Sequence, residues 1–438
     1  MLNAKMKLIS ALVIAGMIVG FPVGTRQLTA QPPPTPMTGM AVSGMEGFDR
    51  LVTSIMAGYN IPGAALAVVK DGRLVYARGY GLADIENNQP AQPESLFRIG
   101  SISKPITAVT VLKLVEEGKL DLDARVFCSN EAACLLGHIQ PPQGITSDPL
   151  LYDITVRHLL QHSAGWDRTV NDRVDVFAHN HRAAAQVLGV TSPVSAESLI
   201  SYAMSLPLDF TPGTRHAYSN FGYMVLARVI ERVTGKSYEE YAKTVLRAAG
   251  VNRMRIGRTL PEGRAEGEVR YYDHPGAPLA TSAFPPYNRV PRPYGGSLIL
   301  EIADGGGGWI ASAIDLVRFV TAVDGARGTA ILKPDTVRLM LARQELPGNG
   351  SAFSYYGLGW GVYLGGSSAN WGHTGGTWGS RNVLFRLFDG KMAWAVVFNS
   401  SPPFEYVGRL LNELGQGLLQ VTGTVKEWPT HDLFEKYP

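Results

Sequence analysis

Cysteine is scarce in this sequence: the 438 residues include two, Cys128 and Cys134. Two thiols cannot by themselves supply a four-ligand metal site. The sequence implies neither a metal nor an organic cofactor. The two lie close together in the sequence, and an exported chain could join them in a disulfide. A loop this short would contribute about 2 kcal/mol to stability. We interpret the pair as a possible local staple.

The sequence also lacks an excess of either charge. It has 40 Lys and Arg against 37 Asp and Glu, a formal net charge of +3, and no block of basic residues. So small a net charge predicts binding neither to nucleic acid nor to an anionic membrane surface. With 45% hydrophobic and 18% charged residues, the composition is that of an ordinary soluble globular protein.

A hydrophobic run long enough to span a bilayer is absent as well. The apolar run at residues 8–23 is shorter than the about 20 residues that a span requires. It follows Lys5 and Lys7 and precedes small residues near Ala30, which is typical of a secretory signal peptide over residues 1–30. We expect a Pro-rich linker over 31–44 and a body that is periplasmic or secreted. An uncleaved N-terminal anchor is the alternative, and it would be the one stable membrane insertion.

Predicted strands at both ends of the chain bracket a helical middle. Apolar runs on either side of Asp71-Gly72 predict a hairpin. This order fits an α+β fold in which one antiparallel sheet, built from both chain ends, is flanked by helices and carries a mainly helical insertion. The expected parts are an α/β part at about 45–125 and 300–425, a helical part at about 126–299 and a tail at 426–438. Helices are predicted over 45–57 (ended by Gly58), 103–117, 220–234, 237–249, 312–323 and 404–419, and C-terminal strands over 358–364, 382–388 and 392–399.

The strongest chemical signal is Ser101-Ile102-Ser103-Lys104 at the start of a predicted helix. Residues three apart share a helix face, so Lys104 can reach the Ser101 hydroxyl, and the helix N-terminus favours an alkoxide. A serine hydroxyl becomes a good nucleophile when a neighbouring group takes its proton. Alone, this short pattern is weak, because most matches to it carry no function.

A second motif is Tyr218-Ser219-Asn220, just before another predicted helix. A phenol held between cations can titrate well below its usual pKa of about 10 and act as a base. The Asn220 side chain offers a donor and an acceptor to a substrate amide. The alternative is that Tyr218 is a core aromatic residue and Asn220 a helix cap.

A third motif is His373-Thr374-Gly375-Gly376, followed by a predicted strand. A glycine-rich strand edge lets a substrate backbone approach and pair with it. One N–H of this segment, together with the Ser101 N–H, could then form an oxyanion hole. A plain turn between strands is the alternative.

Together and in this order, the three motifs resemble the serine β-lactamases and penicillin-binding peptidases, and in pattern most of all the class C β-lactamases with their esterase and D-peptidase relatives. The resemblance implies a β-lactamase-like fold and an acyl-enzyme on Ser101, with Lys104 and Tyr218 sharing the proton transfers. It also implies substrate-binding roles for Asn220, His373, Thr374 and Gly375, and an oxyanion hole of the Ser101 and Gly376 backbone N–H groups.

His373 stands where many of these relatives have lysine. A histidine with the usual pKa near 6.5 is charged only part of the time at neutral pH. Activity on carboxylate-bearing substrates is therefore expected to fall as the pH rises through the pKa of His373.

Other signals favour packing over chemistry. His158 and His162 have the spacing of a helical metal site, but the leucines between them favour a packed helix end, so no metal site is expected. Ser163 lacks the full nucleophile-elbow pattern, and residues 305–308 predict a turn by the cleft. The default expectation for Trp309, Trp371 and Trp378 is core packing.

The sequence as a whole predicts an exported serine hydrolase acting on an amide or ester: a D-Ala peptide, a β-lactam or a small ester. Its expected partner is this small-molecule or peptide substrate. A catalytically silent binding module with the same fold is the alternative.

Overall fold

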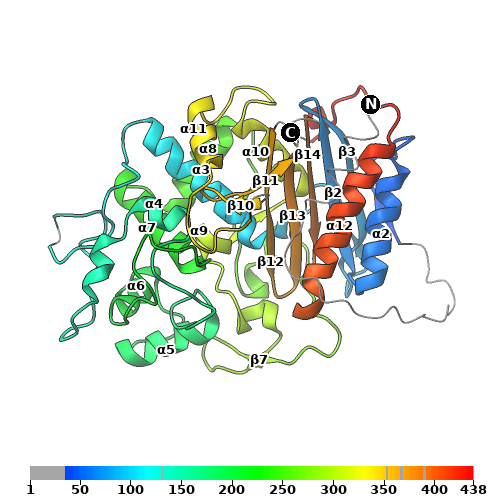
Figure 1. Cartoon of the computed structure of the whole chain (residues 1–438). Helices are drawn as coiled ribbons and strands as arrows, with labels where there is room; N and C mark the ends of the chain where they lie inside the picture. Colours follow the sequence, from blue (N-terminus) through cyan, green and yellow to red (C-terminus); the bar gives the residue numbers. More distant parts are fainter. Residues whose placement is uncertain (1–34, 131, 352–353, 366–367, 388–390, 438) are drawn as a thin grey trace.

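The main sheet of the molecule contains segments from both ends of the chain (Figure 1). The computed structural model describes residues 35–130, 132–351, 354–365, 368–387 and 391–437, so the predicted signal peptide lies outside the described residues. Nine strands form an antiparallel sheet in the order β1-β3-β2-β14-β13-β12-β11-β10, with β4 added to β3. The strands are β1 (Met37–Thr38), β2 (Gly63–Lys70), β3 (Arg73–Asp84), β4 (Gln89–Pro90), β10 (Ser354–Tyr356), β11 (Gly361–Gly365), β12 (Ser368–Thr377), β13 (Ser380–Leu387) and β14 (Met392–Phe398).

The pairing of β2 with β14 joins the two chain ends. Their register runs from Ala64 opposite Phe398 to Lys70 opposite Met392. The predicted hairpin forms between β2 and β3, and its two turn residues, Asp71 and Gly72, both have positive φ (50° and 76°). Such a turn matches the twist of the paired strands. The predicted α+β fold is confirmed.

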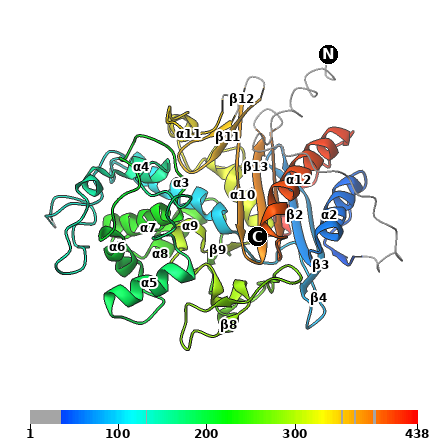
Figure 2. The same ribbon diagram turned by 60° about the horizontal axis from the view of Figure 1, so that its bottom comes forward.

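Helices cover both faces of this sheet (Figures 1 and 2). Helices α2 (Glu46–Tyr59) and α12 (Phe404–Thr424) pack side by side on one face, and α3 (Ser103–Glu116) and α10 (Ala313–Val323) belong to the other. Successive side chains of β2 alternate between the two hydrophobic cores, as strand geometry requires: Ala64, Leu66 and Val68 face α2 and α12, and Ala65, Ala67 and Val69 face the other side.

The middle of the chain is mainly helical, as predicted, but includes short strands. Its helices are α4 (Val156–Leu160), α5 (Ala178–Leu188), α6 (Ala196–Met204), α7 (Asn220–Thr234) and α8 (Tyr238–Ala248). Further along lie α9 (Asp304–Gly307) and α11 (Pro334–Leu341). The small sheets are β5 (Phe97–Arg98) with β9 (Trp309–Ala311) and β6 (Arg255–Ile256), and β7 (Ala280–Thr281) with β8 (Arg289–Val290). Single helical turns occur at Gly100–Ile102, Pro149–Asp153, Pro261–Gly263 and Leu433–Glu435, and the turn at Arg292–Gly296 contains residues with non-helical φ and ψ.

Several predicted boundaries need correction. Helix α2 passes Gly58 and ends at Asn60, which adopts the left-handed conformation (φ 54°). The strand predicted from 358 begins at Gly361, and α12 continues to Thr424. Within the predicted linker, β1 joins the sheet, and the predicted tail packs against the body through buried Leu433 and Phe434.

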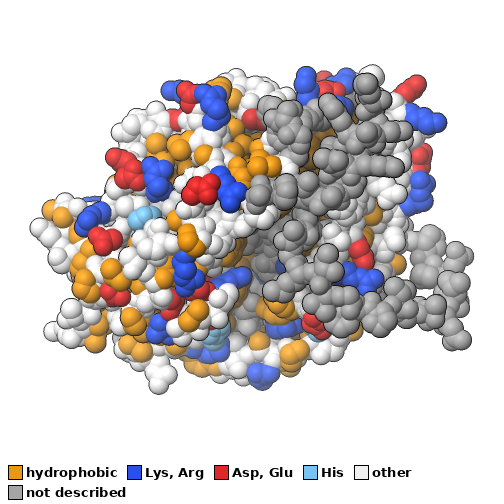
Figure 3. All heavy atoms as spheres, in the orientation of Figure 1, with side chains coloured by type: hydrophobic (Ala, Val, Ile, Leu, Met, Phe, Trp, Pro, Cys, Tyr) orange, Lys and Arg blue, Asp and Glu red, His pale blue; other side chains and the backbone are white. Residues whose placement is uncertain are grey.

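The possible staple between Cys128 and Cys134 is confirmed as a disulfide. On the face in Figure 3, Lys and Arg side chains lie interspersed with Asp and Glu. Within the described residues, no helix has the length and apolar character to cross a membrane. In the same part of the chain, no group of three or more His, Cys, Asp or Glu side chains is placed to hold a metal ion.

Candidate active site

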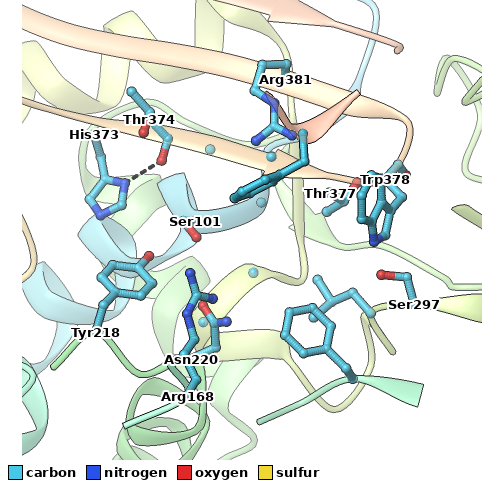
Figure 4. Close-up of a pocket in the computed structure, with 18 residues that line it drawn as sticks. Ser101, Arg168, Tyr218, Asn220, Ser297, His373, Thr374, Thr377, Trp378 and Arg381 are labelled. Atoms are coloured by element: carbon cyan, nitrogen blue, oxygen red, sulfur yellow. Dashed lines mark hydrogen bonds between the residues drawn. The ribbon is translucent and has the colours of Figure 1, made fainter. Parts of the chain in front are cut away.

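Ser101 lies in a single helical turn, Gly100–Ile102, that leads into α3, and strand β12 runs directly beside it (Figure 4). Glycine permits this approach. A Cβ on Gly100 would lie 2.5 Å from the Gly376 nitrogen, and a Cβ on Gly375 would collide with the Ile99 carbonyl. Gly100 also has φ 54°, which a side chain disfavours. The glycines of the first and third motifs thus bring the two segments together.

Lys104 projects from the first turn of α3 and is completely buried. Its Nζ donates to Asn220 Oδ1 and to the Gly306 carbonyl, each at 2.7 Å, and lies 3.2 Å from Ser101 Oγ. The two short bonds occupy two N–H groups in either charge state. In the neutral amine, the lone pair is therefore left to face the Ser101 hydroxyl.

Asn220 is the first residue of α7 and is held by an acid that the sequence analysis missed. Its Nδ2 donates to Asp175 Oδ2 at 2.8 Å, and Asp175 lies 3.7 Å from Arg168 Nη1. Ser219 caps α7 by accepting from the Gly222 N–H, so the alternative of Asn220 as the cap is wrong. Asp175 and Arg168 lie in the loop before α5, which carries no motif, and only the tertiary fold brings them to Asn220.

Burial shifts the pKa values of Lys104 and Asp175 in this network. Burial holds the pKa of Lys104 well below its usual range, while the Asp175 carboxylate raises it and Arg168 lowers it. Burial also raises the pKa of Asp175, against the lowering effect of Arg168 and of the Asn220 hydrogen bond. A lysine with a lowered pKa can be a neutral base near neutral pH.

Tyr218 precedes α7, and its hydroxyl points toward Ser101 in Figure 4. The cations lie over its ring: Lys104 Nζ is 4.7 Å and Arg168 Cζ 5.2 Å from the ring centroid. Burial raises the pKa of Tyr218 well above its usual value, and the Ser101 contact and Arg168 lower it only in part. The expected low pKa is therefore wrong for the free enzyme, in which Tyr218 is a neutral phenol.

His373, on β12, is buried and neutral. Its Nδ1 lies 2.5 Å from the Thr374 carbonyl oxygen, which can only accept, so Nδ1 carries the proton. Its Nε2 then accepts from the Tyr356 hydroxyl at 3.0 Å. Burial lowers the pKa of His373 to about 3, with a smaller lowering effect from the Lys104 ammonium when that group is charged. The prediction of a partly charged His373 near neutral pH is wrong, because both ring nitrogens are engaged and the ring is out of water.

Five of these residues line one pocket, whereas Lys104 and Asp175 do not (Figure 4). The five are Ser101, Arg168, Tyr218, Asn220 and His373. Thr374 and Gly375 line it beside His373, as do Gly306 and Gly307 of α9, so the predicted turn by the cleft is a short helix at its wall. Trp309 and Trp371 are buried in the core, whereas Trp378 lines the pocket, against expectation. The lining residues are Gly100, Ser101, Arg168, Phe177, Tyr218, Asn220, Ser297, Leu298, Gly306, Gly307, His373, Thr374, Gly375, Gly376, Thr377, Trp378, Arg381 and Phe404.

The weaker signals lie outside this pocket. His158 completes the cap of α4, where its Nδ1 accepts from the Thr155 N–H. His162 is buried, and its Nδ1 accepts from the Ser219 N–H. Ser163 is completely buried and accepts from Gln161 Nε2, so it cannot meet a substrate.

Known proteins share both the sequence pattern and the fold. The family model described as Beta-lactamase matches residues 48–416. The chain is 28% identical over 345 residues to Esterase EstB of Burkholderia gladioli, covering 75% of this chain and 81% of that protein. It is 27% identical over 389 residues to Penicillin-binding protein 4 of Amycolatopsis lactamdurans, covering 84% and 88%.

Solved structures agree. The octameric penicillin-binding protein homologue from Pyrococcus abyssi aligns with a TM-score of 0.61 and 28% identity, covering 89% of this chain and 80% of that one. The D-amino acid amidase from Ochrobactrum anthropi SV3, complexed with L-phenylalanine, has the same fold, with a TM-score of 0.66 at 22% identity over 88% and 99% of the chains. The family match runs from α2 into α12 and includes all three motifs, so the chain belongs to the beta-lactamase family and is a serine hydrolase.

Proposed function

We propose that this protein is an exported serine hydrolase that cleaves an amide or ester through an acyl-enzyme on Ser101. The main support for this proposal is the position of the Lys104 amine beside the Ser101 hydroxyl. Its Nζ is 3.2 Å from Ser101 Oγ, its other two short hydrogen bonds go to fixed acceptors, and burial lowers its pKa. This is the arrangement that a base for a serine nucleophile requires.

The reaction follows from these positions. Ser101 Oγ attacks the substrate carbonyl carbon while its proton passes to the neutral amine of Lys104. The C–N or C–O bond of the tetrahedral intermediate then breaks, and the leaving group takes a proton from the neutral Tyr218 phenol, which Lys104 reprotonates. Water next attacks the acyl-enzyme, releasing the acid and restoring the Ser101 hydroxyl.

Backbone N–H groups are placed to donate hydrogen bonds to the substrate carbonyl. The N–H groups of Ser101 and Gly376 are proposed as oxyanion donors, since the glycines at 100 and 375 hold β12 against the nucleophile turn. The Asn220 side chain also takes part. One N–H of its amide donates to Asp175, and the second N–H can donate to a substrate carbonyl. Thr374, exposed on β12, and Gly375 present the strand edge along which a substrate backbone can pair.

The test is covalent labelling with a fluorophosphonate, read by intact-protein mass and peptide mapping. We expect one adduct, on Ser101, and none on Ser101→Ala. Ser163→Ala is the matched control, since this serine is buried outside the pocket and its loss should leave labelling unchanged. Normal labelling of folded Ser101→Ala would overturn the proposal.

Export is proposed from the sequence alone: Lys5 and Lys7, the apolar run at 8–23 and the small residues near Ala30. N-terminal sequencing of the native protein from the culture fluid and cell envelope tests it. We expect a mature chain that starts near Gln31. A chain that keeps Met1 in the membrane fraction would indicate the uncleaved anchor, and one confined to the cytoplasm would contradict export.

A further inference from the structure

His162 packs against Tyr218 and is used by none of the reaction steps above. It follows the end of α4, and its backbone is left-handed, with φ 58°. Residues with a side chain adopt this conformation rarely, and the strain persists only where the surrounding structure enforces it. The residue is buried, with 1% of its surface exposed. The fold therefore holds His162 in one strained position, directly beside a motif of the active site.

Two hydrogen bonds join His162 to the segment that carries Tyr218, one on each side of Tyr218 in the sequence. The His162 carbonyl accepts from the Ala217 N–H at 2.7 Å. The Nδ1 atom of its ring accepts from the Ser219 N–H at 3.2 Å. One residue thus fixes the backbone before and after the phenol, and the second of these bonds lies directly before Asn220 at the start of α7.

The imidazole ring of His162 also supports the Tyr218 ring. The two ring centroids are 4.3 Å apart, and the rings of Tyr356 and Tyr223 lie 4.7 and 5.1 Å from the same imidazole. Burial holds the pKa of His162 well below its usual range, so the ring is neutral. A neutral imidazole has a single acceptor nitrogen, which here is Nδ1. The one acceptor of the ring is thus used to hold the Tyr218 segment.

We propose that His162 is a positioning residue, which holds the Tyr218 phenol where it can protonate the leaving group. The inference rests on the proposed function. In that step the C–O or C–N bond breaks, its electron pair stays on the leaving atom, and the phenol proton moves to that atom. An acid must lie within hydrogen-bond reach of its target, and a misplacement of about 1 Å can cost about 100-fold in rate. Figure 4 shows the Tyr218 hydroxyl directed toward Ser101, as this step requires.

The experiment compares two esters that form the same acyl-enzyme, ethyl butyrate and 4-nitrophenyl butyrate. The 4-nitrophenolate group leaves as a stable anion, whereas the ethoxide group needs a proton from the acid. The readout is the leaving-group ratio, which is kcat/KM for the ethyl ester divided by kcat/KM for the 4-nitrophenyl ester. Each kcat/KM reports the steps up to the acyl-enzyme. Fluorophosphonate labelling of Ser101 counts the folded active sites in each variant.

Two variants suit the left-handed backbone of position 162 and differ in the acceptor. Glycine and asparagine both adopt positive φ readily, but only the asparagine amide oxygen can replace Nδ1. We expect His162→Gly to lower the leaving-group ratio by about 10- to 100-fold, with little change for the 4-nitrophenyl ester. His162→Asn should recover most of the ratio. In a Tyr218→Phe background, His162→Gly should not lower the ratio further, because the two residues act in one step.

His158→Leu is the matched control. The Nδ1 atom of His158 also accepts a backbone N–H, that of Thr155, but this bond caps α4 and does not involve the Tyr218 segment. The variant should leave the leaving-group ratio unchanged. His162→Leu fills the space of the ring and lacks the acceptor, so it takes the place of His162→Gly if the glycine variant does not fold.

Three results would overturn the inference: an unchanged ratio in a labelled variant without the acceptor, an equal loss on both esters, or a loss that persists in the Tyr218→Phe background. The second would indicate a purely structural role. If wild type is not labelled at Ser101, the proposed function fails. If Tyr218→Phe keeps the wild-type ratio, Tyr218 is not the acid, and the inference fails with that step. If Tyr218→Phe lowers the ratio and the variants of His162 do not, only the positioning role fails.

Discussion

The two walls of the pocket balance their charges in different ways. On the α3–α7 wall, Lys104 has two acceptors and the Ser101 hydroxyl around its amine, and Asp175 contacts both Asn220 and Arg168. On the β12–β13 wall, His373 is neutral, and the hydrogen-bond partner of the Arg381 guanidinium among the described residues is the Ser401 hydroxyl. On the first wall, the hydrogen bonds and ion pairs of the catalytic groups are already formed before a substrate binds, as preorganised catalysis requires. The second carries a guanidinium that has no acidic partner among the described residues.

The largest loss of kcat should come from removing Lys104, the proposed base on the α3–α7 wall. Lys104→Met keeps the length and apolar packing of the side chain but cannot take the Ser101 proton, so kcat should fall by about 10²- to 10⁴-fold. Steady-state hydrolysis of a neutral aryl ester measures it. A near-normal kcat would show that another group acts as the base.

Removing the Asp175 carboxylate from the same wall should shift the pH dependence of kcat/KM. Lys104 acts as a base when neutral, so kcat/KM rises as the pH rises through its pKa. The Asp175 carboxylate raises that pKa. Asp175→Asn removes the charge, so the pKa should fall further and the acid limb should move to lower pH. The profile is measured with a neutral ester.

The control for this shift is Asp167→Asn. Asp167 lies in the same loop but pairs with Arg215 at 2.7 Å, and it does not influence the pKa of Lys104. Its variant should keep the limb in place. A limb that stays fixed in Asp175→Asn, or moves to higher pH, would contradict the role given to Asp175.

The smallest effect on activity should come from the disulfide, because neither cysteine lines the pocket. Replacing Cys128 and Cys134 by serine should lower the free energy of unfolding by about 2 kcal/mol, from the entropy of a short loop. Denaturant unfolding measures it, and hydrolysis of a neutral aryl ester should remain normal in the folded enzyme. A change in kcat/KM for this ester would mean that the loop affects the pocket.

Local signals allowed much of the fold and part of the site to be predicted. Helix α7 has the predicted bounds because a serine cap and Gly235 mark its ends, and the Ser101–Lys104 pair follows from helix spacing. Strand β12 was harder to recognise at full length, because its glycines weaken the alternation that marks a strand.

The missing parts depend on tertiary structure. Asp175 reaches Asn220 from a loop without a motif, and Arg381 lines the pocket from its register position opposite Gly376. The charge states of Tyr218 and His373 were predicted wrongly because the sequence shows neighbours along the chain but not burial, which is the largest influence on both pKa values.

The pairing of β2 with β14 also dictates an order of assembly. Ser101 and Lys104 lie in the first third of the chain, whereas the Gly306 carbonyl and the Gly376 N–H come long after them. Sheets closed by such distant segments form slowly, since the loop entropy is lost before the contacts are gained. During synthesis, a growing chain therefore carries its nucleophile well before it carries the groups that would make that nucleophile reactive.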